Sequence, residues 1–324
     1  ALPISASYWM HTIPSDRAPR LDRDTKDGAT IHFAIESDPG DLVFDGKVSR
    51  GTAAGTYAFK PKKAFADEAG KLLKEDLSNN DLLDLSFSDI SLNYIRDIVG
   101  AGIDARLKTI LRLRNHGVKS AEAKEFAASG FNNADDIVRF RDHGVKSDLA
   151  RDAKQLGFVK DAEGVVKMRD HGIDAAYLKA WKEAGFQLTS DDLVRLRNNG
   201  LKADYAAAWK KAGYNLSPEE LIRARNFGVP SDFAAALGAA GNKPTIDEAI
   251  RMRQFGVDAK YFRAIRDLNA AYTVEDIVKF RQHGVPAEYV SGIKIAGRPA
   301  VDAQTIIDLR NRGVSAETAR KLRQ

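Results

Sequence analysis

Apolar positions recur at a fixed spacing through most of the chain, and glycine marks each period. An arginine stands three residues before a glycine eight times, and these glycines are 27 to 29 residues apart. In nearly every copy the places seven, six and four residues before the glycine are apolar, as at Leu193, Val194 and Leu196. This spacing puts the apolar side chains on one face of a helix. The pairs are Arg114 with Gly117, Arg141 with Gly144, Arg169 with Gly172, Arg197 with Gly200, Arg225 with Gly228, Arg253 with Gly256, Arg281 with Gly284 and Arg310 with Gly313.

A second column of glycines, 13 residues after the first, predicts a second helix in each repeat. Glycine often follows a helix C-terminus because it takes positive φ without a Cβ clash, and asparagine is the usual substitute. Thr245 and Glu248 have the spacing of a capping box, and the paired acids Glu219 and Glu220 suit a first helical turn. The second column contains Gly102, Gly130, Gly157, Gly185, Gly213, Gly241, Asn269 and Gly297. Each repeat is therefore predicted to be two short helices.

Residues 81–324 are expected to form an α-solenoid of about nine repeats of 28 residues. A two-helix repeat cannot bury its apolar face alone, so neighbouring repeats must stack into a continuous core. That core should include Trp181 and Trp209, which stand four residues before a glycine of the second column. The first and last repeats are expected to be degenerate caps, and the first has Asp89 where the others have glycine.

Residues 1–61 lack the repeat and predict a small antiparallel β domain. Ile31, Phe33 and Ile35 alternate with polar residues, as in a half-buried strand. A further strand is predicted over 7–12 and a loop over 16–26. The glycines at 46, 51 and 55 suit tight turns or bulges. Residues 62–80 are predicted to contain a linking helix before the repeats.

The composition and motifs argue against catalysis. The 324 residues have a net charge of +5 and include no cysteine, which excludes disulfides, thiolate metal sites and a cysteine nucleophile. No apolar run approaches the length of a membrane span. The sequence lacks His-Glu-x-x-His, Gly-x-Ser-x-Gly and a nucleotide-binding loop. We therefore expect no enzyme activity, no cofactor and no metal.

The eight arginines that precede the first glycine column have two interpretations. Each follows an apolar position by one helical turn, so its stem should flank the core and its head should bond carbonyls or acids of the adjacent helix. The alternative is a ladder of cations for a polyanion. The basic residue two places earlier is expected to face solvent and to pair with an acid four residues before it, as Arg139 with Asp135. Residues 81–324 contain 39 Lys and Arg against 33 Asp and Glu, evenly mixed, which disfavours nucleic-acid binding.

Histidine and tyrosine form two further columns. His116, His143, His171 and His283 directly precede a glycine, about one helix spacing apart, which is too far to share a zinc ion, so they are expected to pack at helix ends. A tyrosine column near the start of the second helix is interpreted mainly as packing. As an alternative, its phenols reach the surface and form part of a binding face. The members of this column considered for the surface are Tyr177, Tyr205, Tyr261 and Tyr289.

The repeats, for instance residues 136–145 with Arg141, His143 and Gly144, resemble those in the extracytoplasmic C-terminal part of some BlaR/MecR-like bacterial sensor-regulator membrane proteins. The segment from Val43 to Pro61 is similar to the short β segment ahead of them. Such sensors carry a zinc-peptidase motif in their membrane part, and this sequence has none, so no catalytic residue is transferred. The resemblance implies a bacterial, periplasmic or extracytoplasmic sensing region, with a cytoplasmic location as the alternative. A chain that starts at an alanine is also compatible with removal of a signal peptide or anchor.

These observations predict a non-enzymatic binding or scaffold module that uses a solenoid surface for protein–protein interaction, as a monomer or weak oligomer. One alternative is binding of nucleic acid or another polyanion through the arginine columns. A second alternative is a sensor of cell-envelope ligands.

Overall fold

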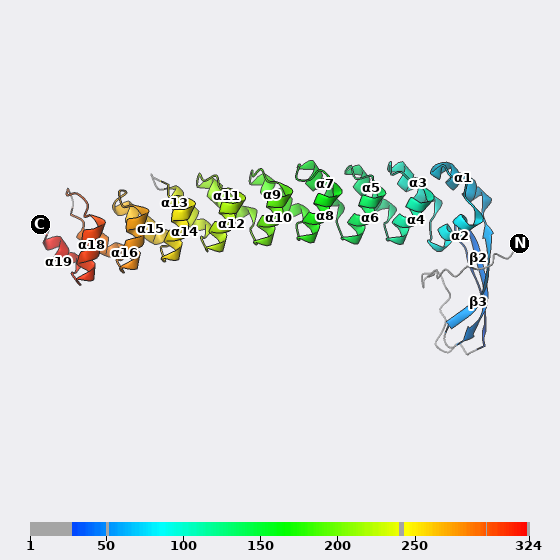
Figure 1. Ribbon diagram of the computed structural model, residues 1–324, viewed down its shortest axis with the longest axis horizontal. Helices are drawn as coiled ribbons and strands as arrows, with labels where there is room; N and C mark the ends of the chain where they lie inside the picture. Colours follow the sequence, from blue (N-terminus) through cyan, green and yellow to red (C-terminus); the bar gives the residue numbers. More distant parts are fainter. Residues whose placement is uncertain (1–27, 50–51, 240–242, 296, 323–324) are drawn as a thin grey trace. The chain divides into compact units, whose positions relative to one another are not determined.

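The computed structural model describes residues 28–49, 52–239, 243–295 and 297–322 (Figure 1). These residues form 19 helices and three strands, and the chain divides into two compact units, Ala1–Asp170 and His171–Gln324. The mainly helical fold with a small sheet before regularly spaced helices is the one predicted. The predicted strand over 7–12, the loop over 16–26 and the glycines at 51 and 241 lie outside the described residues.

The first unit contains the sheet and eight helices. Its elements are β1 (Thr30–Ile35), β2 (Gly40–Ser49), β3 (Thr52–Pro61), α1 (Lys63–Leu73), α2 (Asn79–Phe87), α3 (Leu92–Gly100), α4 (Leu107–Asn115), α5 (Ser120–Ala128), α6 (Ala134–Asp142), α7 (Ser147–Gln155) and α8 (Ala162–Asp170).

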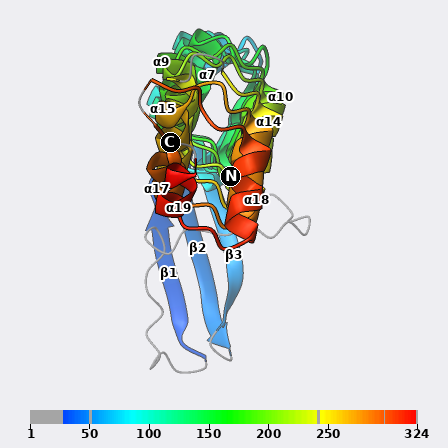
Figure 2. The same cartoon turned by 90° about the vertical axis from the view of Figure 1, so that its left-hand side faces the viewer.

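The sheet is antiparallel, with strand order β1, β2, β3 (Figure 2). Its register sets Phe33 opposite Phe44 and Phe44 opposite Tyr57. The Phe33 and Phe44 rings stack with centroids 4.6 Å apart, and Phe87 of α2 meets Tyr57 edge-on at 6.0 Å. The predicted alternation therefore forms one apolar face, and α2 covers it.

Two of the strand glycines are not in turns, contrary to expectation. Gly46 and Gly55 lie inside β2 and β3 and face each other directly. A Cβ on Gly55 would come within 2.0 Å of the Asp45 carbonyl oxygen. Glycine is needed here because two backbones approach closely, and a one-strand pattern cannot reveal that pairing.

The helices of the first unit pack in two rows. The odd-numbered helices α1, α3, α5 and α7 contact one another in order, as do the even-numbered α2, α4, α6 and α8. α1 was predicted as a linking helix, and it packs against α3 as the first member of the odd-numbered row.

The second unit repeats this arrangement without a sheet. Within it each helix contacts the next helix of the same parity, so the odd-numbered and even-numbered helices again form two rows. Its helices are α9 (Ala175–Glu183), α10 (Ser190–Asn198), α11 (Ala203–Lys211), α12 (Pro218–Asn226), α13 (Ser231–Gly238), α14 (Ile246–Gln254), α15 (Ala259–Leu268), α16 (Val274–Gln282), α17 (Ala287–Ile293), α18 (Ala303–Asn311) and α19 (Ala316–Lys321).

The helix ends follow the sequence signals closely. Ser217, Thr245 and Thr273 each close a capping box with the acid three residues later. Every described glycine of both columns has positive φ, between 63° and 82°. Asp89 takes the place of a glycine with φ of 52°. Asn269 does not substitute for glycine as predicted, because its φ is −157° and its backbone is extended.

The core is the continuous strip between the two rows of each unit. The column four residues before the second glycine is buried throughout, and Trp181 and Trp209 are 0% and 1% exposed. None of the helices in the described part of the chain combines the length and the apolar character that crossing a bilayer requires.

Two glycines of the first unit test why glycine follows the helix ends. Gly102 has φ of 74°, Gly100 is the last residue of α3, and neither has an atom within 4 Å of an added Cβ. We expect Gly102→Ala to lower the free energy of unfolding by about 1 kcal/mol, because a left-handed backbone disfavours a side chain. The matched Gly100→Ala should raise it by about 0.5 kcal/mol. Urea denaturation followed by circular dichroism measures both, and equal effects of the two changes would contradict this account.

Candidate interaction surface

The arginines three residues before the first glycine column reach back to the preceding repeat. In five of the eight, Nε donates to the carbonyl of the residue at or beside the end of the preceding even-numbered helix. These bonds run from Arg114 to Ser88 (3.1 Å), Arg169 to Gly144 (2.9 Å), Arg253 to Gly228 (2.9 Å), Arg281 to Gly256 (3.0 Å) and Arg310 to Gly284 (3.2 Å). The arginines thus make the carbonyl contacts expected of a structural role. Most of their side chains are nevertheless exposed.

The other three arginines lie in equivalent places with different partners. Arg141 Nη1 is 3.7 Å from the Glu122 carboxylate. The Arg197 guanidinium lies over the Tyr177 ring, 5.2 Å from its centroid. Arg225 is exposed, and its charge acts on Tyr205 to oppose the rise in that phenol's pKa that burial causes.

The tyrosine column lies at the contact between repeats and not on the surface. We call the glycines of the first column corner glycines. Each hydroxyl donates to the carbonyl of the residue that follows a corner glycine of the next repeat. The bonds join Tyr94 to Val118, Tyr177 to Leu201, Tyr205 to Val229, Tyr261 to Val285 and Tyr289 to Val314, at 2.5–3.0 Å. Tyr177, Tyr261 and Tyr289 are only 5–8% exposed and Tyr205 is half-buried, which agrees with the packing interpretation and not with the alternative of a surface binding face.

Each of two tyrosine rings contacts the arginine in the last turn of the helix whose end its hydroxyl bonds. The Arg281 guanidinium lies 5.0 Å from the centroid of the Tyr261 ring, and Arg310 lies 5.5 Å from that of Tyr289. Burial raises the pKa of Tyr261 to about 12, and the positive charge of Arg281 only partly opposes this rise. Tyr261 therefore stays neutral at physiological pH and donates its proton to the Val285 carbonyl.

The odd-numbered helices have a matching lysine that the sequence analysis missed. Lys154 Nζ donates to the Gly130 carbonyl at 2.6 Å and lies 4.4 Å from the centroid of the Phe131 ring. Lys210 Nζ donates to the Gly185 carbonyl at the same distance. Both lysines stand three residues before a glycine of the second column, which is the offset of the arginines from the first. That shared offset was the signal available in the sequence.

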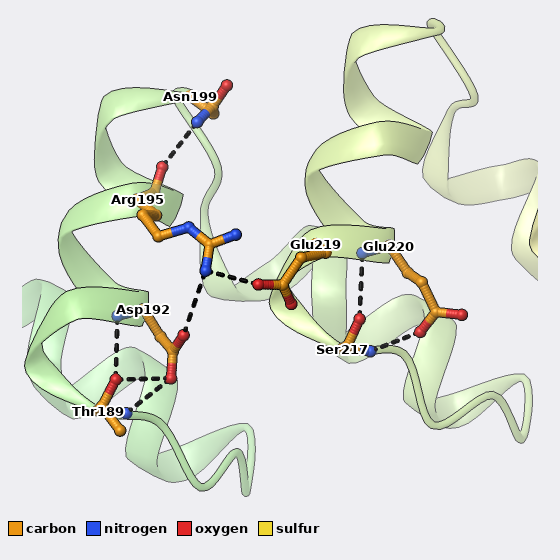
Figure 3. Close-up of polar contacts among 7 residues, drawn as sticks. All are labelled: Thr189, Asp192, Arg195, Asn199, Ser217, Glu219 and Glu220. Carbon is orange, nitrogen blue, oxygen red and sulfur yellow. Dashed lines mark hydrogen bonds and ion pairs between the residues drawn. The ribbon is translucent and has the colours of Figure 1, made fainter.

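The basic residues five places before the first glycine column pair across repeats. Arg195 Nη1 lies 2.5 Å from the Glu219 carboxylate of the next repeat and 3.9 Å from Asp192 of its own helix (Figure 3). Asp135 likewise pairs with Arg112 of the preceding repeat. The expected partner was Arg139, four residues later in the same helix. The acids of a first turn thus face the preceding repeat. Because the pairs are exposed to solvent, each contributes little to stability.

The histidines also bridge neighbouring repeats. The Nδ1 atoms of His116 and His143 lie 2.9 Å and 3.0 Å from the carboxylates of Asp142 and Asp170. His171 and His283 contact Asn198 and Asn311 in the same way, at 3.0 Å and 3.2 Å. Each partner stands two residues before the next corner glycine. In the described part of the chain no group of three or more His, Cys, Asp or Glu could hold a metal ion.

The residue directly before each corner glycine varies, although the positions around it are constant. After the even-numbered helices of the second unit we call this column the even-helix edge; its members are Asn199, Phe227, Phe255, His283 and Arg312. All five are exposed. Phe227 and Phe255 are 49% and 39% exposed, which is high for large apolar side chains. Sequence analysis had noted this place only for its histidines.

The architecture and the surface define the class of protein, a helical-repeat protein with a short β-sheet segment. No family of known proteins, no curated protein and no solved structure matches the chain. What the surface binds must therefore be argued from its own chemistry.

Tyr261→Phe tests the tyrosine contact between repeats. At pH 8 the free energy of unfolding of the variant should be about 1 kcal/mol lower than that of the intact chain, because the Val285 carbonyl loses its donor. The folded-state pKa of about 12 lies above the usual 10.0. The phenol of the unfolded chain therefore ionises first, and native Tyr261 loses its stabilising effect as pH rises from about 10 to about 12. The deficit of the variant should shrink at pH 11. Denaturant titrations at pH 8 and 11 measure it, and an unchanged deficit would show that burial does not perturb this phenol.

Proposed function

We propose that this chain is a non-enzymatic binding module that recognises another protein through the exposed edge of its repeats. One observation carries the proposal. Along the even-helix edge the exposed side chain before the glycine is Asn, Phe, Phe, His and Arg in turn, whereas the arginine two places before it and the buried apolar positions keep their character. A constant frame with one variable exposed position per repeat is how repeat proteins present extended binding surfaces.

The two phenylalanines of the even-helix edge suit this role because their side chains are not needed to end the helix. Phe227 and Phe255 cap their helices through backbone N–H groups alone. Their replacement should therefore change binding with little effect on folding.

A second candidate, binding of a polyanion, is favoured by the distribution of charge. Residues 171–324 contain 24 Lys and Arg against 18 Asp and Glu, whereas residues 1–170 contain 26 against 27. Against this candidate, acids of the next repeat neutralise Arg195, Arg223 and Arg251 in the second unit. Nucleic-acid binders cluster cations on a face with few acids. We therefore place protein recognition first.

The location is part of the same proposal. The resemblance of the repeats to the extracytoplasmic region of BlaR/MecR-like sensor-regulators supports a role at the bacterial envelope, where the module would contribute the sensing surface. A ligand from the cell wall would then raise the melting temperature of the chain, because it binds the folded state alone.

Capture from an extract of the host cell tests the proposal. The intact chain should crosslink a protein that is lost when the five residues of the even-helix edge are changed to serine. The control changes five exposed residues elsewhere in the second unit to serine, and should keep the capture; these residues are Glu183, Lys202, Lys211, Asp232 and Lys260. Both variants should have the same melting temperature as the intact chain.

Two results would overturn the proposal. One is equal capture by the edge variant and the control. The other is capture of no protein by the intact chain while labelled DNA or RNA binds with an affinity that falls steeply with salt, the mark of phosphate contacts.

A further inference from the structure

Two exposed rings on neighbouring repeats form an apolar strip in the second unit. Phe227 follows α12 and Phe255 follows α14, and these even-numbered helices contact each other. Because packed helices lie about 8–10 Å apart, equivalent side chains recur at roughly that spacing. Repeats that have histidine at this place use it to reach the next repeat, but phenylalanine has no polar group to do so.

An arginine of the next repeat reaches the glycine that follows each phenylalanine. The glycine after Phe227 accepts the Nε bond of Arg253 at 2.9 Å, and the glycine after Phe255 accepts that of Arg281 at 3.0 Å. The order along the edge is therefore Phe227, Arg253, Phe255, Arg281, which we call the Phe–Arg row. Rings and cations alternate along it.

The two arginines of the Phe–Arg row have no carboxylate partner in the part of the chain that the structure describes. Among the described residues no carboxylate oxygen lies within 4.0 Å of the Arg253 or Arg281 guanidinium. In the first unit, by contrast, Asp89 lies 3.2 Å from Arg114 and Glu122 lies 3.7 Å from Arg141. With Nε bonded to a carbonyl, the terminal nitrogens of Arg253 and Arg281 remain to bind a carboxylate from outside.

We infer that the Phe–Arg row binds an acidic, extended segment of a partner protein, in which an apolar residue recurs about every third position with Asp or Glu between. This inference rests on the proposed function and names the partner's chemistry. In the extended polyproline II conformation a chain rises about 3.1 Å per residue with three residues per turn, so every third side chain faces the row and one turn spans about one repeat. The apolar side chains of the segment cover the two rings, and its carboxylates pair with the guanidinium groups.

The surroundings of the row favour an acidic peptide over a nucleic acid. The Arg251 guanidinium already lies over the Phe255 ring, 5.6 Å from its centroid, and so competes with a stacking base. Glu275, which lies 2.9 Å from Arg251, brings a carboxylate close to the same ring. A continuous phosphate backbone would meet that negative charge, whereas a peptide can place an apolar side chain there.

Panning a displayed library of random 16-residue peptides against the intact chain tests the inference. The enriched peptides should combine acidic and apolar residues at a period of about three. A synthetic, fluorescein-labelled copy of one such peptide should bind roughly tenfold or more weakly to the Phe227→Ser, Phe255→Ser double variant. It should bind equally to the intact chain and to a Lys202→Ser, Lys260→Ser control. Fluorescence anisotropy measures the affinities, and matching melting curves show that the variants fold.

Several outcomes would overturn the inference. They are enrichment of no peptide, enrichment of peptides without an acidic bias, equal binding to the Phe double variant, and tighter Phe-dependent binding of a single-stranded 15-nucleotide DNA. If the five-site edge variant still loses a captured protein in such a case, the proposed function stands and only the Phe–Arg row is excluded. If the intact chain captures no protein, the proposed function fails as well.

Discussion

The structure depends on helices that are too short to be stable alone. Most of them have nine residues, and isolated helices below about 12–15 residues are marginal in water. Each helix must therefore bury its apolar face against its neighbours, and the strip that includes Trp181 and Trp209 is almost inaccessible to solvent. A glycine just after most helix ends lets the chain return at once for the next contact. The constant period follows from this requirement.

Short helices also end often, and every end leaves carbonyl groups without an intrahelical partner. Neighbouring repeats supply the donors: Arg253 of the next repeat for Gly228, Lys210 of the next repeat for Gly185, and the Tyr261 hydroxyl of the preceding repeat for Val285. Arginine suits this place because its fork can give Nε to a carbonyl while the terminal nitrogens point away. The two interpretations of the arginine column are therefore compatible, because one side chain ties repeats together and still presents charge to solvent.

The fold was largely predictable because its determinants are local. Capping boxes such as Ser217 with Glu220, the corner glycines and the apolar face all lie within one helix or turn. The missed features depend on distances between repeats or strands. The pairing of Arg195 with Glu219, the bond from the Tyr261 hydroxyl to the Val285 carbonyl and the close approach of Gly46 to Gly55 each need the neighbour in place. The Phe–Arg row was not predicted for the same reason, since its arginines come from the repeat after each ring.

The even-helix edge is where an array of this kind can vary at little cost. The side chain before a corner glycine makes no core contact, so folding does not select it. Where histidine stands, as at His283, the side chain adds a bond to the next repeat. Phenylalanine at 227 and 255 adds no such bond and leaves apolar surface in water, which lowers solubility without strengthening the fold. A polar residue would serve the free chain better at both places. Two rings on adjacent repeats, each followed by a glycine bonded to an arginine without a carboxylate partner among the described residues, are instead what binding an acidic and apolar segment requires.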